Sequence, residues 1–332
     1  GVKPHNIYKL ILAYCLWTKT HYKKFEEFDG VKTADIINKL KKNTVPTKAV
    51  EYSIPEWLAE TLEKELGPSW EKEMMALNEQ APTILRVNTL KTTAKELISD
   101  LKVEGVDSFQ IKNYPDAVQL DVKKNVFLTT AFKDGLFEVQ DASSQKIGQL
   151  LDVQEGMRVV DVCAGAGGKT LHLAALMKNK GQIIALDIYE WKLAELKRRA
   201  KRAGAHNIET RVIEDNKVIK RLHEKADRLL IDSPCSGLGV LKRNPDSKWK
   251  IDQEFIDRIK KEQEKILQDY AKILKKGGKM IYATCSILPS ENNEQVEIFL
   301  KNNEGYSLIK EEKVMPSEGF DGFYMALIER KA

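Results

Sequence analysis

The sequence predicts an α/β fold in which a doubly wound parallel sheet occupies residues 151–332. Apolar, strand-like runs alternate there with longer helix-like segments, a pattern typical of a parallel sheet covered on both faces. A glycine-rich turn separates the first of these strands from the next helix. The residues before this region do not show this regular alternation. They predict a helical segment over 1–80 and a small α+β domain over 81–150.

The N-terminal segment is predicted to be helical from the periodicity of its apolar residues, with interruptions at Pro46 and Pro55. Its most apolar stretch, Ile7–Trp17, is too short for a membrane span and lacks a signal-peptide cleavage site, so it predicts an amphipathic helix. The chain begins with Gly rather than Met. We therefore expect the native start to be missing and this segment to be truncated.

The small domain is predicted from one strand and one capped helix. Leu85–Asn88 is typical of a strand, and a helix is expected from Thr93, which serves as its cap, to Lys102. Short strand-like pieces follow at 118–120 and 126–129.

In the large sheet, strands are expected at 159–162, 183–187, 208–213, 228–231 and 280–284. Helices are expected at 171–177, 190–203 and 253–274, the last closed by Gly277-Gly278. A final strand at 323–328 is expected at an edge of the sheet.

Composition narrows the class of protein. Of the 332 residues, 42% are hydrophobic and 31% are charged, which is ordinary for a soluble globular protein. A net charge of +5 is compatible with a nucleic-acid partner without establishing one. The four cysteines are widely spaced and the five histidines show no zinc-ligand spacing, so we expect free thiols, a cytoplasmic setting and no metal site. The oligomeric state is left open.

The glycine-rich turn reads Asp161-Val-Cys-Ala-Gly-Ala-Gly-Gly-Lys-Thr170, in which glycines let the backbone approach a ligand at a helix N-terminus. A phosphate-binding P-loop would need glycine in place of Cys163, and a dinucleotide fold would need it in place of Thr170. Adenosylmethionine uses the same architecture with a looser glycine pattern. A turn that only lets helix meet strand is the structural alternative.

Three aspartates follow strands at the edge of the sheet where ligands bind. Asp187 is placed to accept hydrogen bonds from ribose hydroxyls, or to cap the next helix. Asp215 and its neighbour Glu214 are placed to accept from an adenine amino group, although a solvated loop is nearly as well supported. Asp232 ends the fourth strand. With the glycine turn, these acids predict a nucleoside-type cofactor.

Two cysteines also follow strands. Cys235 lies in the turn Asp232-Ser-Pro-Cys-Ser-Gly-Leu-Gly239, and Cys285 lies in Ala283-Thr-Cys-Ser286. Both thiols are therefore expected on the face that binds the cofactor. An isolated cysteine is more often a small buried hydrophobe, but the surrounding Pro, Ser and Gly favour partly exposed turns.

Together these features resemble the Sun/Fmu-type RNA cytosine-5 methyltransferases of the NOP2/Sun superfamily across most of the chain. The motifs that carry the likeness are Asp232-Ser-Pro-Cys235, Thr284-Cys-Ser286, Arg243–Trp249, Leu85–Thr89, Val139–Gln145 and Phe320–Tyr324. The resemblance implies a class I methyltransferase with a Rossmann-like sheet, an RRM-like small domain and an RNA-binding N-terminal domain. It also implies S-adenosylmethionine as cofactor and RNA as partner, which is ribosomal RNA in related bacterial enzymes.

For the site, the resemblance implies that Cys285 is the nucleophile and that Cys235 assists breakdown of the covalent adduct. Thiolate addition at carbon 6 of cytosine makes carbon 5 nucleophilic, and Asp232 is placed to stabilise charge near ring nitrogen 3. The residues implied to hold the cofactor are Cys163, Ala164, Gly165, Ala166, Gly167, Gly168, Lys169, Asp187, Asp215 and Asp232. Gly165 and Ala166 replace the family's usual Ala-Pro, which we expect to loosen the turn and keep its N–H groups.

RNA contacts are expected from cations near the catalytic turn and from the small domain. The predicted residues are Lys242, Arg243, Lys248, Arg86 and Asn88. Trp249 stands among the first three and is equally suited to stacking or packing. The basic helix 190–202 is interpreted as a solvated face. The target base has to be single-stranded or flipped out.

Two other functions account for part of the sequence. A nucleotide-binding oxidoreductase would use the glycine turn and Asp187 but would leave Cys235 and Cys285 without a role. A catalytically silent RNA-binding scaffold would keep the fold, although the two intact cysteines weigh against it.

Overall fold

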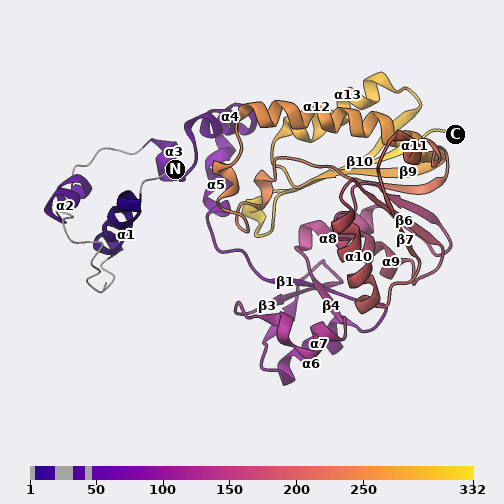
Figure 1. The fold of residues 1–332 in the computed structure, drawn as a ribbon, viewed down its shortest axis with the longest axis horizontal. Helices are drawn as coiled ribbons and strands as arrows, with labels where there is room; N and C mark the ends of the chain where they lie inside the picture. The colour runs from indigo at the N-terminus through magenta and orange to yellow at the C-terminus, as the bar shows by residue number, and fades with distance from the viewer. Residues whose placement is uncertain (1–3, 19–32, 42–46) are drawn as a thin grey trace. The chain divides into compact units, whose positions relative to one another are not determined.

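The computed structural model describes residues 4–18, 33–41 and 47–332. The chain divides into two compact units, Gly1–Glu51 and Tyr52–Ala332 (Figure 1). The predicted domain boundaries near residues 80 and 150 both fall within the second unit, and they stay predictions.

The described part of the first unit is helical, as the sequence predicts. It contains α1 (Pro4–Thr18), α2 (Thr33–Lys41) and α3 (Lys48–Glu51). The helix predicted over Ile7–Trp17 is confirmed as part of α1. Pro46, where an interruption is predicted, lies outside the described residues.

The second unit begins with α4 (Glu56–Leu66) and α5 (Trp70–Leu77), joined by the 3-10 turn η2 (Gly67–Ser69). Pro55 immediately precedes α4, which confirms the break predicted there. Two carboxylates anchor these helices to later loops: Glu65 accepts hydrogen bonds from the N–H and hydroxyl of Ser290, and Glu73 accepts the same pair from Ser317. Among the described helices, none is long and apolar enough to cross a membrane.

The small α+β region is a four-stranded antiparallel sheet in the order β2-β3-β1-β4. Its strands are β1 (Ile84–Val87), β2 (Ser108–Gln110), β3 (Ala117–Leu120) and β4 (Phe137–Val139). The predicted Thr93 cap of α6 (Ala94–Val103) is confirmed, and it forms part of a capping box in which Thr93 and Glu96 bond each other's backbone N–H. The strand predicted at 126–129 is wrong: the side chain of Asn125 caps a 3-10 turn there, η3 (Val126–Leu128), which leads into α7 (Thr130–Lys133).

The large sheet has seven strands in the order β10-β11-β9-β8-β5-β6-β7. The strands are β5 (Arg158–Asp161), β6 (Gln182–Asp187), β7 (Ile208–Val212), β8 (Ala226–Asp232), β9 (Leu274–Thr284), β10 (Tyr306–Val314) and β11 (Phe323–Arg330). The strands from β5 to β9 pair in parallel, whereas β11 pairs antiparallel with both β9 and β10. The predicted doubly wound α/β class is thereby confirmed, with an antiparallel extension.

Helices cover both faces of the large sheet. They are α8 (Ala142–Leu150), α9 (Gly168–Leu176), α10 (Glu190–Ala203), α11 (Asn216–Lys220), α12 (Gln253–Tyr270) and α13 (Asn293–Asn302). Figure 1 shows α12 and α13 on one side of the sheet and α8, α9 and α10 on the other. Neighbouring strand residues alternate between the two cores, with Val159 and Ile183 in one and Val160 and Ile184 in the other. Burial on both faces explains why these strands read as continuous apolar runs.

Two predictions near the end of the chain are wrong. The final strand, β11, lies inside the sheet, and the edge strand on this side is β10, which carries the consecutive charged residues 310–313 and was not predicted. The long helix ends at Tyr270 rather than 274, and Gly277-Gly278 lies within β9. Pairing there jumps from Ala226–Leu274 to Arg228–Lys279, and Gly277 takes a positive φ of 72° in the inserted segment.

Candidate active site

A cavity of about 690 Å³ lies where β5, β6, β8 and β9 reach their carboxyl ends. The strand order reverses beside β5, and this switch point is where ligands bind in doubly wound sheets. The predicted site residues that line the cavity are Cys163, Gly165, Lys169, Asp187, Asp232, Cys235 and Cys285. The predicted loop residues that do not line it are Ala164, Ala166, Gly167 and Gly168.

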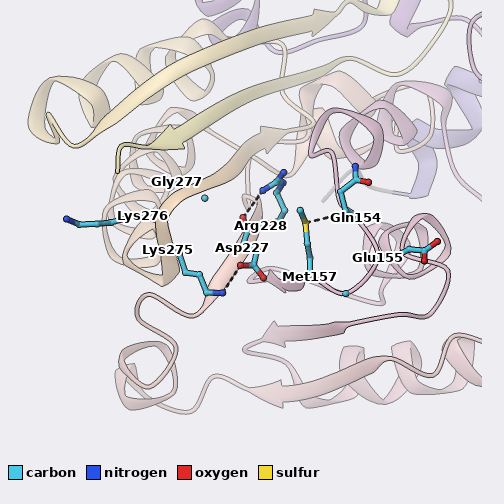
Figure 2. A pocket seen from close by; sticks show the side chains of 10 residues that line it. Gln154, Glu155, Met157, Asp227, Arg228, Lys275, Lys276 and Gly277 are labelled. Carbon is cyan, nitrogen blue, oxygen red and sulfur yellow. Dashed lines mark hydrogen bonds and ion pairs between the residues drawn. The ribbon is translucent and has the colours of Figure 1, made fainter.

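A second cavity, of about 450 Å³, lies at the opposite edge of the sheet (Figure 2). It is lined by the turn before β5 and by the first residues of β8 and β9. Figure 2 shows Lys275 directed toward Asp227. The Lys275 amine lies 2.6 Å from the Asp227 carboxylate, and Arg228 donates to the carbonyl of Leu151 at 2.9 Å. None of the predicted site residues lines this second cavity, so the first is the candidate active site.

The glycine turn between β5 and α9 needs glycine at two positions. The backbone φ is 54° at Gly165 and 85° at Gly167, and a side chain at Gly167 would overlap Leu196. The N–H of Gly165 donates to the carboxylate of Asp187 at 2.8 Å, and the N–H of Tyr189 donates to the same carboxylate at 2.8 Å. Asp187 therefore fixes the turn, whereas the N-cap position of α10 is occupied by Tyr189.

Lys169 and Asp232 form an ion pair in the cavity. Their Nζ and Oδ2 atoms lie 2.5 Å apart, and the side chains are 14% and 28% exposed. Burial opposes the charge on Lys169, but the charge and hydrogen bond of Asp232, together with nearby Cys285, raise the pKa of Lys169 above its ordinary value. A protonated amine thus lies near the thiol of Cys285.

The structure brings the two strand-end cysteines together. The Sγ atoms of Cys235 and Cys285 lie 3.4 Å apart, and both residues line the cavity. A hydrogen bond with Cys285, burial, and the charges of Cys285 and Glu291 raise the pKa of Cys235 well above its ordinary value. Cys235 therefore holds its proton more tightly than an ordinary thiol does.

Comparison of the sequence with models of known protein families agrees with the geometry of the cavity. A family sequence model described as 16S rRNA methyltransferase RsmB/F matches residues 148–328, more than half of the chain. The chain belongs to the RsmB/F family. A second family model, described as the ferredoxin-like domain of RsmF/B-like methyltransferases, matches residues 54–127. The resemblance drawn from the sequence motifs is thereby confirmed.

Individual members of the RsmB/F family are similar over much of this chain. Ribosomal RNA small subunit methyltransferase B of Proteus mirabilis (strain HI4320) is 34% identical, over 84% of this chain and 66% of that protein. The probable small subunit methyltransferase B of Synechocystis is 36% identical, over 77% of this chain and 58% of that protein. The chain thus spans less than two thirds of the length of these relatives. The solved structure of PH0851 superposes with a TM-score of 0.82 at 28% identity, covering 99% of this chain and 78% of that one.

Methyltransferases of the RsmB/F family use S-adenosylmethionine, and the cavity residues fit that cofactor. Small-molecule sites have volumes of about 300–1,000 Å³, which includes this cavity. The carboxylates of Asp187 and Asp232 can accept hydrogen bonds from the hydroxyl and ammonium groups of the cofactor. Ile188, Ile213 and Tyr270 also line the cavity and provide apolar surface for its flat base.

Asp215 has a different place from the other two acids. Its carboxylate accepts from the N–H of Lys217 at 2.7 Å and caps α11. Neither Asp215 nor Glu214 lines the cavity, but their neighbours Ile213 and Asn216 do. Ile213 and Asn216 were not predicted as site residues, although the signal for them is their place between the end of β7 and the start of α11.

Arg86 and Asn88, predicted to contact RNA, are buried instead, with exposed fractions of 3% and 7%. Arg86 donates to the side chain of Gln140 at 2.5 Å and to the carbonyl of Gly168 in the glycine turn. Asn88 donates to the carbonyl of Ala203 in α10 at 2.8 Å. Both side chains thus bond the small sheet to α9 and α10, and their burial gives them a structural role.

The cations predicted beside the catalytic turn are also engaged within the protein. Arg243 lies 2.6 Å from the carboxylate of Asp321 and 2.8 Å from that of Asp141. Lys242 donates to a backbone carbonyl at 3.1 Å, and Lys248 is only 5% exposed. These bonds connect segments of the chain, and contact of Lys242 and Arg243 with RNA stays a prediction.

The basic helix α10 is only partly a solvated face. Arg199 and Arg202 both pair with Glu138 of the small sheet, at 3.0 and 2.5 Å, and Glu138 is buried. Lys197 and Lys201 on the same helix are exposed. The sequence analysis predicted the solvated residues correctly but missed the buried pairs, because Glu138 lies far away in the sequence.

Proposed function

We propose that this protein is an S-adenosylmethionine-dependent methyltransferase that modifies carbon 5 of a cytosine in ribosomal RNA. The observation that carries the proposal is the 3.4 Å approach of Cys235 and Cys285 beside the Lys169–Asp232 pair. Methylation of a pyrimidine at carbon 5 needs a nucleophile that adds transiently to the ring, whereas methylation of an amine or hydroxyl does not. A thiol pair in the cavity of an RsmB/F methyltransferase therefore favours carbon 5 chemistry.

Cys285 is the proposed nucleophile. Its thiolate forms a bond to carbon 6, and the electron pair of the C5=C6 bond makes carbon 5 nucleophilic. The bound cofactor supplies an electrophilic methyl group to that carbon. Lys169 stabilises the thiolate before addition. Asp232 is proposed to face ring nitrogen 3, where addition builds up negative charge, and to pass to that nitrogen a proton that its carboxylate receives from the Lys169 ammonium 2.5 Å away.

Cys235 is proposed to assist breakdown of the adduct. The proton on carbon 5 passes to a base, the electrons of that bond restore the C5=C6 bond, and the C6–S pair returns to the sulfur of Cys285. The thiol of Cys235 lies 3.4 Å from that sulfur and its raised pKa keeps it protonated, so it can donate a hydrogen bond that stabilises the departing thiolate while keeping its own proton.

The proposed RNA presents its target base outside a duplex, because carbon 5 and carbon 6 have to reach a cavity. Trp249, which follows the Cys235 turn and is 59% exposed, supplies an aromatic surface for a neighbouring base. Two thiols 3.4 Å apart stay reduced more readily in a reducing compartment, which supports the proposal that the protein acts in the cytoplasm.

The test is methyl transfer to defined RNA. The chain is incubated with methyl-labelled S-adenosylmethionine and either small-subunit ribosomal RNA or transfer RNA, and the digested nucleosides are identified by mass spectrometry. We expect 5-methylcytosine in the ribosomal RNA alone. Label on any other base position, or in transfer RNA alone, would overturn the proposal. RNA binding without transfer would indicate the silent scaffold, and binding of a nicotinamide cofactor in place of S-adenosylmethionine would indicate the oxidoreductase.

A further inference from the structure

Glu291 is a carboxylate in the protein interior directly behind the two thiols. It ends the short turn η7 (Pro289–Glu291), which follows the Cys285 turn, and it is 0% exposed. Burying a carboxylate is costly unless hydrogen bonds replace the lost water, so its place requires an explanation.

Four hydrogen bonds supply the compensation, and three of them come from the residues that follow the thiols. One carboxylate oxygen of Glu291 accepts from the hydroxyls of Ser236 and Ser286, at 2.5 and 2.6 Å. The other oxygen accepts from the backbone N–H of Ser236 at 2.8 Å and from the side chain of Gln263 at 2.9 Å. Ser236 is bonded directly to Cys235 in the chain, and Ser286 to Cys285.

The same network reaches α12. The side-chain amide of Gln263 donates to Glu291 and also to the carbonyl of Pro234, the residue before Cys235, at 2.9 Å. The Cys235 turn is thus held on both sides of its thiol. Backbone bonds between the two turns, such as Gly239 N–H to the carbonyl of Cys285 at 2.9 Å, align the chains but do not fix the serine side of either turn.

We propose that Glu291 is a positioning residue that holds the Cys235 and Cys285 turns so that their thiols stay within reach of one another. The catalytic consequence rests on the proposed function: resolution of the Cys285 adduct depends on the distance to Cys235. Active-site groups work within about 0.5 Å of their productive positions, and a displacement of about 1 Å costs on the order of 10²-fold in rate. Loss of the Glu291 bonds therefore slows turnover without removing a group that contacts the substrate.

The first test measures the thiols without any RNA. Diamide oxidises two neighbouring thiols to a disulfide: two S–H bonds break, one S–S bond forms, and the two protons and two electrons reduce diamide to its hydrazine. The variants are Glu291→Gln, Glu291→Ala and the double variant Ser236→Ala/Ser286→Ala. The rate of the Cys235–Cys285 bridge is followed by peptide mass spectrometry and divided by the iodoacetamide alkylation rate of the same thiols.

The matched control is Glu65→Gln. Glu65 likewise accepts from the N–H and hydroxyl of a serine, Ser290, at 3.0 and 2.8 Å, one residue before Glu291. We expect bridging to slow about tenfold in Glu291→Gln and further in Glu291→Ala, because glutamine keeps one acceptor oxygen, while Glu65→Gln stays within about twofold of the parent. If Glu291→Ala does not fold, Glu291→Gln and the serine double variant still test the positioning role of Glu291. Bridging at the parent rate in these folded variants overturns the proposal.

The second test distinguishes an effect on substrate binding from an effect on turnover. With ribosomal RNA and S-adenosylmethionine, Glu291→Gln should lower kcat about tenfold or more while both KM values stay within about twofold, because Glu291 contacts neither ligand pocket surface nor solvent. An equal rise in KM with unchanged kcat contradicts a positioning role. If the parent chain transfers no methyl group, the proposed function fails, and the diamide rates still decide the role of Glu291.

Discussion

The ammonium group of Lys169 lies 2.5 Å from a carboxylate oxygen of Asp232, although the two residues come from the glycine turn after β5 and from the end of β8. The pair joins the turn implied to hold a cofactor to the turn that carries Cys235. It also brings a positive charge near Cys285, whose own charge contributes to the raised pKa of Lys169. Lys169 thus belongs to the proposed catalytic group as well as to the glycine turn.

Replacing Lys169 by methionine should therefore impair chemistry. The Lys169→Met variant keeps the length of the side chain but removes its charge, so the thiolate of Cys285 loses stabilisation and Asp232 loses its partner. We expect kcat for methyl transfer to fall by about 10²-fold, as for other groups that stabilise developing charge. Lys197→Met, on the exposed face of α10, is the control and should transfer at the parent rate. Single-turnover methylation that is unchanged in Lys169→Met would contradict the catalytic assignment.

The two cysteines should differ in what their removal does. Cys285→Ala should abolish both methylation and covalent RNA attachment, because no thiolate remains to add to carbon 6. Cys235→Ala should form the adduct and fail to resolve it, so a covalent enzyme–RNA complex accumulates on denaturing gels. Cys15→Ala, in α1, should behave as the parent. An adduct in Cys285→Ala and none in Cys235→Ala would reverse the two roles.

Arg243 should act on stability more than on RNA affinity. Its guanidinium pairs with Asp141 and Asp321, which are 7% and 3% exposed. Arg243→Ala leaves two buried carboxylates without a cation and should lower the free energy of unfolding by about 3–5 kcal/mol, measured by urea titration. Arg243→Lys should recover only part of this loss, because one ammonium cannot bridge both carboxylates. Full stability combined with weaker RNA binding would restore the predicted phosphate contact.

Asp161, at the end of β5, should make stability depend on pH. Burial, only partly offset by the hydrogen bond from Thr170, raises the pKa of Asp161 to about 7. The folded protein then binds this proton more tightly than the unfolded chain does. The stability contributed by Asp161 is present below the ordinary pKa of 3.8 and is lost as the pH rises through about 7.

Asp161→Asn removes this titration. The variant should gain stability relative to the parent between pH 5 and pH 8, by at most about 4 kcal/mol, as measured by urea unfolding at each pH. Asp100→Asn, at an exposed position of α6, serves as the control. A difference between variant and parent that does not change with pH would show that Asp161 does not titrate in this range.

The local pattern of apolar and polar residues was sufficient to predict much of the fold. The alternation of apolar strands and helices predicted the doubly wound sheet, and the positions of Asp187, Asp232, Cys235 and Cys285 after strands placed them at one edge. These predictions succeeded because parallel strands end at the same edge whatever their neighbours are. The edge strand β10 was missed because four consecutive charged residues, 310–313, interrupt any apolar pattern, and only its pairing with β11 identifies it.

The partners of charged side chains were not predictable in the same way. Arg243 pairs with carboxylates 78 and 102 residues away, and Arg86 reaches the glycine turn 82 residues later. A cation in a sequence is expected to be solvated, and nothing in its neighbours shows that a distant carboxylate or carbonyl will cover it. The predicted RNA contacts of the four cations relied on that expectation. In the structure, Arg86 and Lys248 are buried, as is Asn88, the fifth predicted contact.

The sequence by itself determined the fold class, the cofactor edge and the two cysteines, because periodicity and strand ends are local properties of the chain. The tertiary structure alone decided that the thiols lie 3.4 Å apart, that Lys169 pairs with Asp232, and that a buried Glu291 joins the serines behind both thiols. Each of these depends on distances between segments that meet only when the sheet has closed and its helices have packed. Hydrogen bonds and ion pairs act over a few ångströms, and residue order alone does not specify separations on that scale.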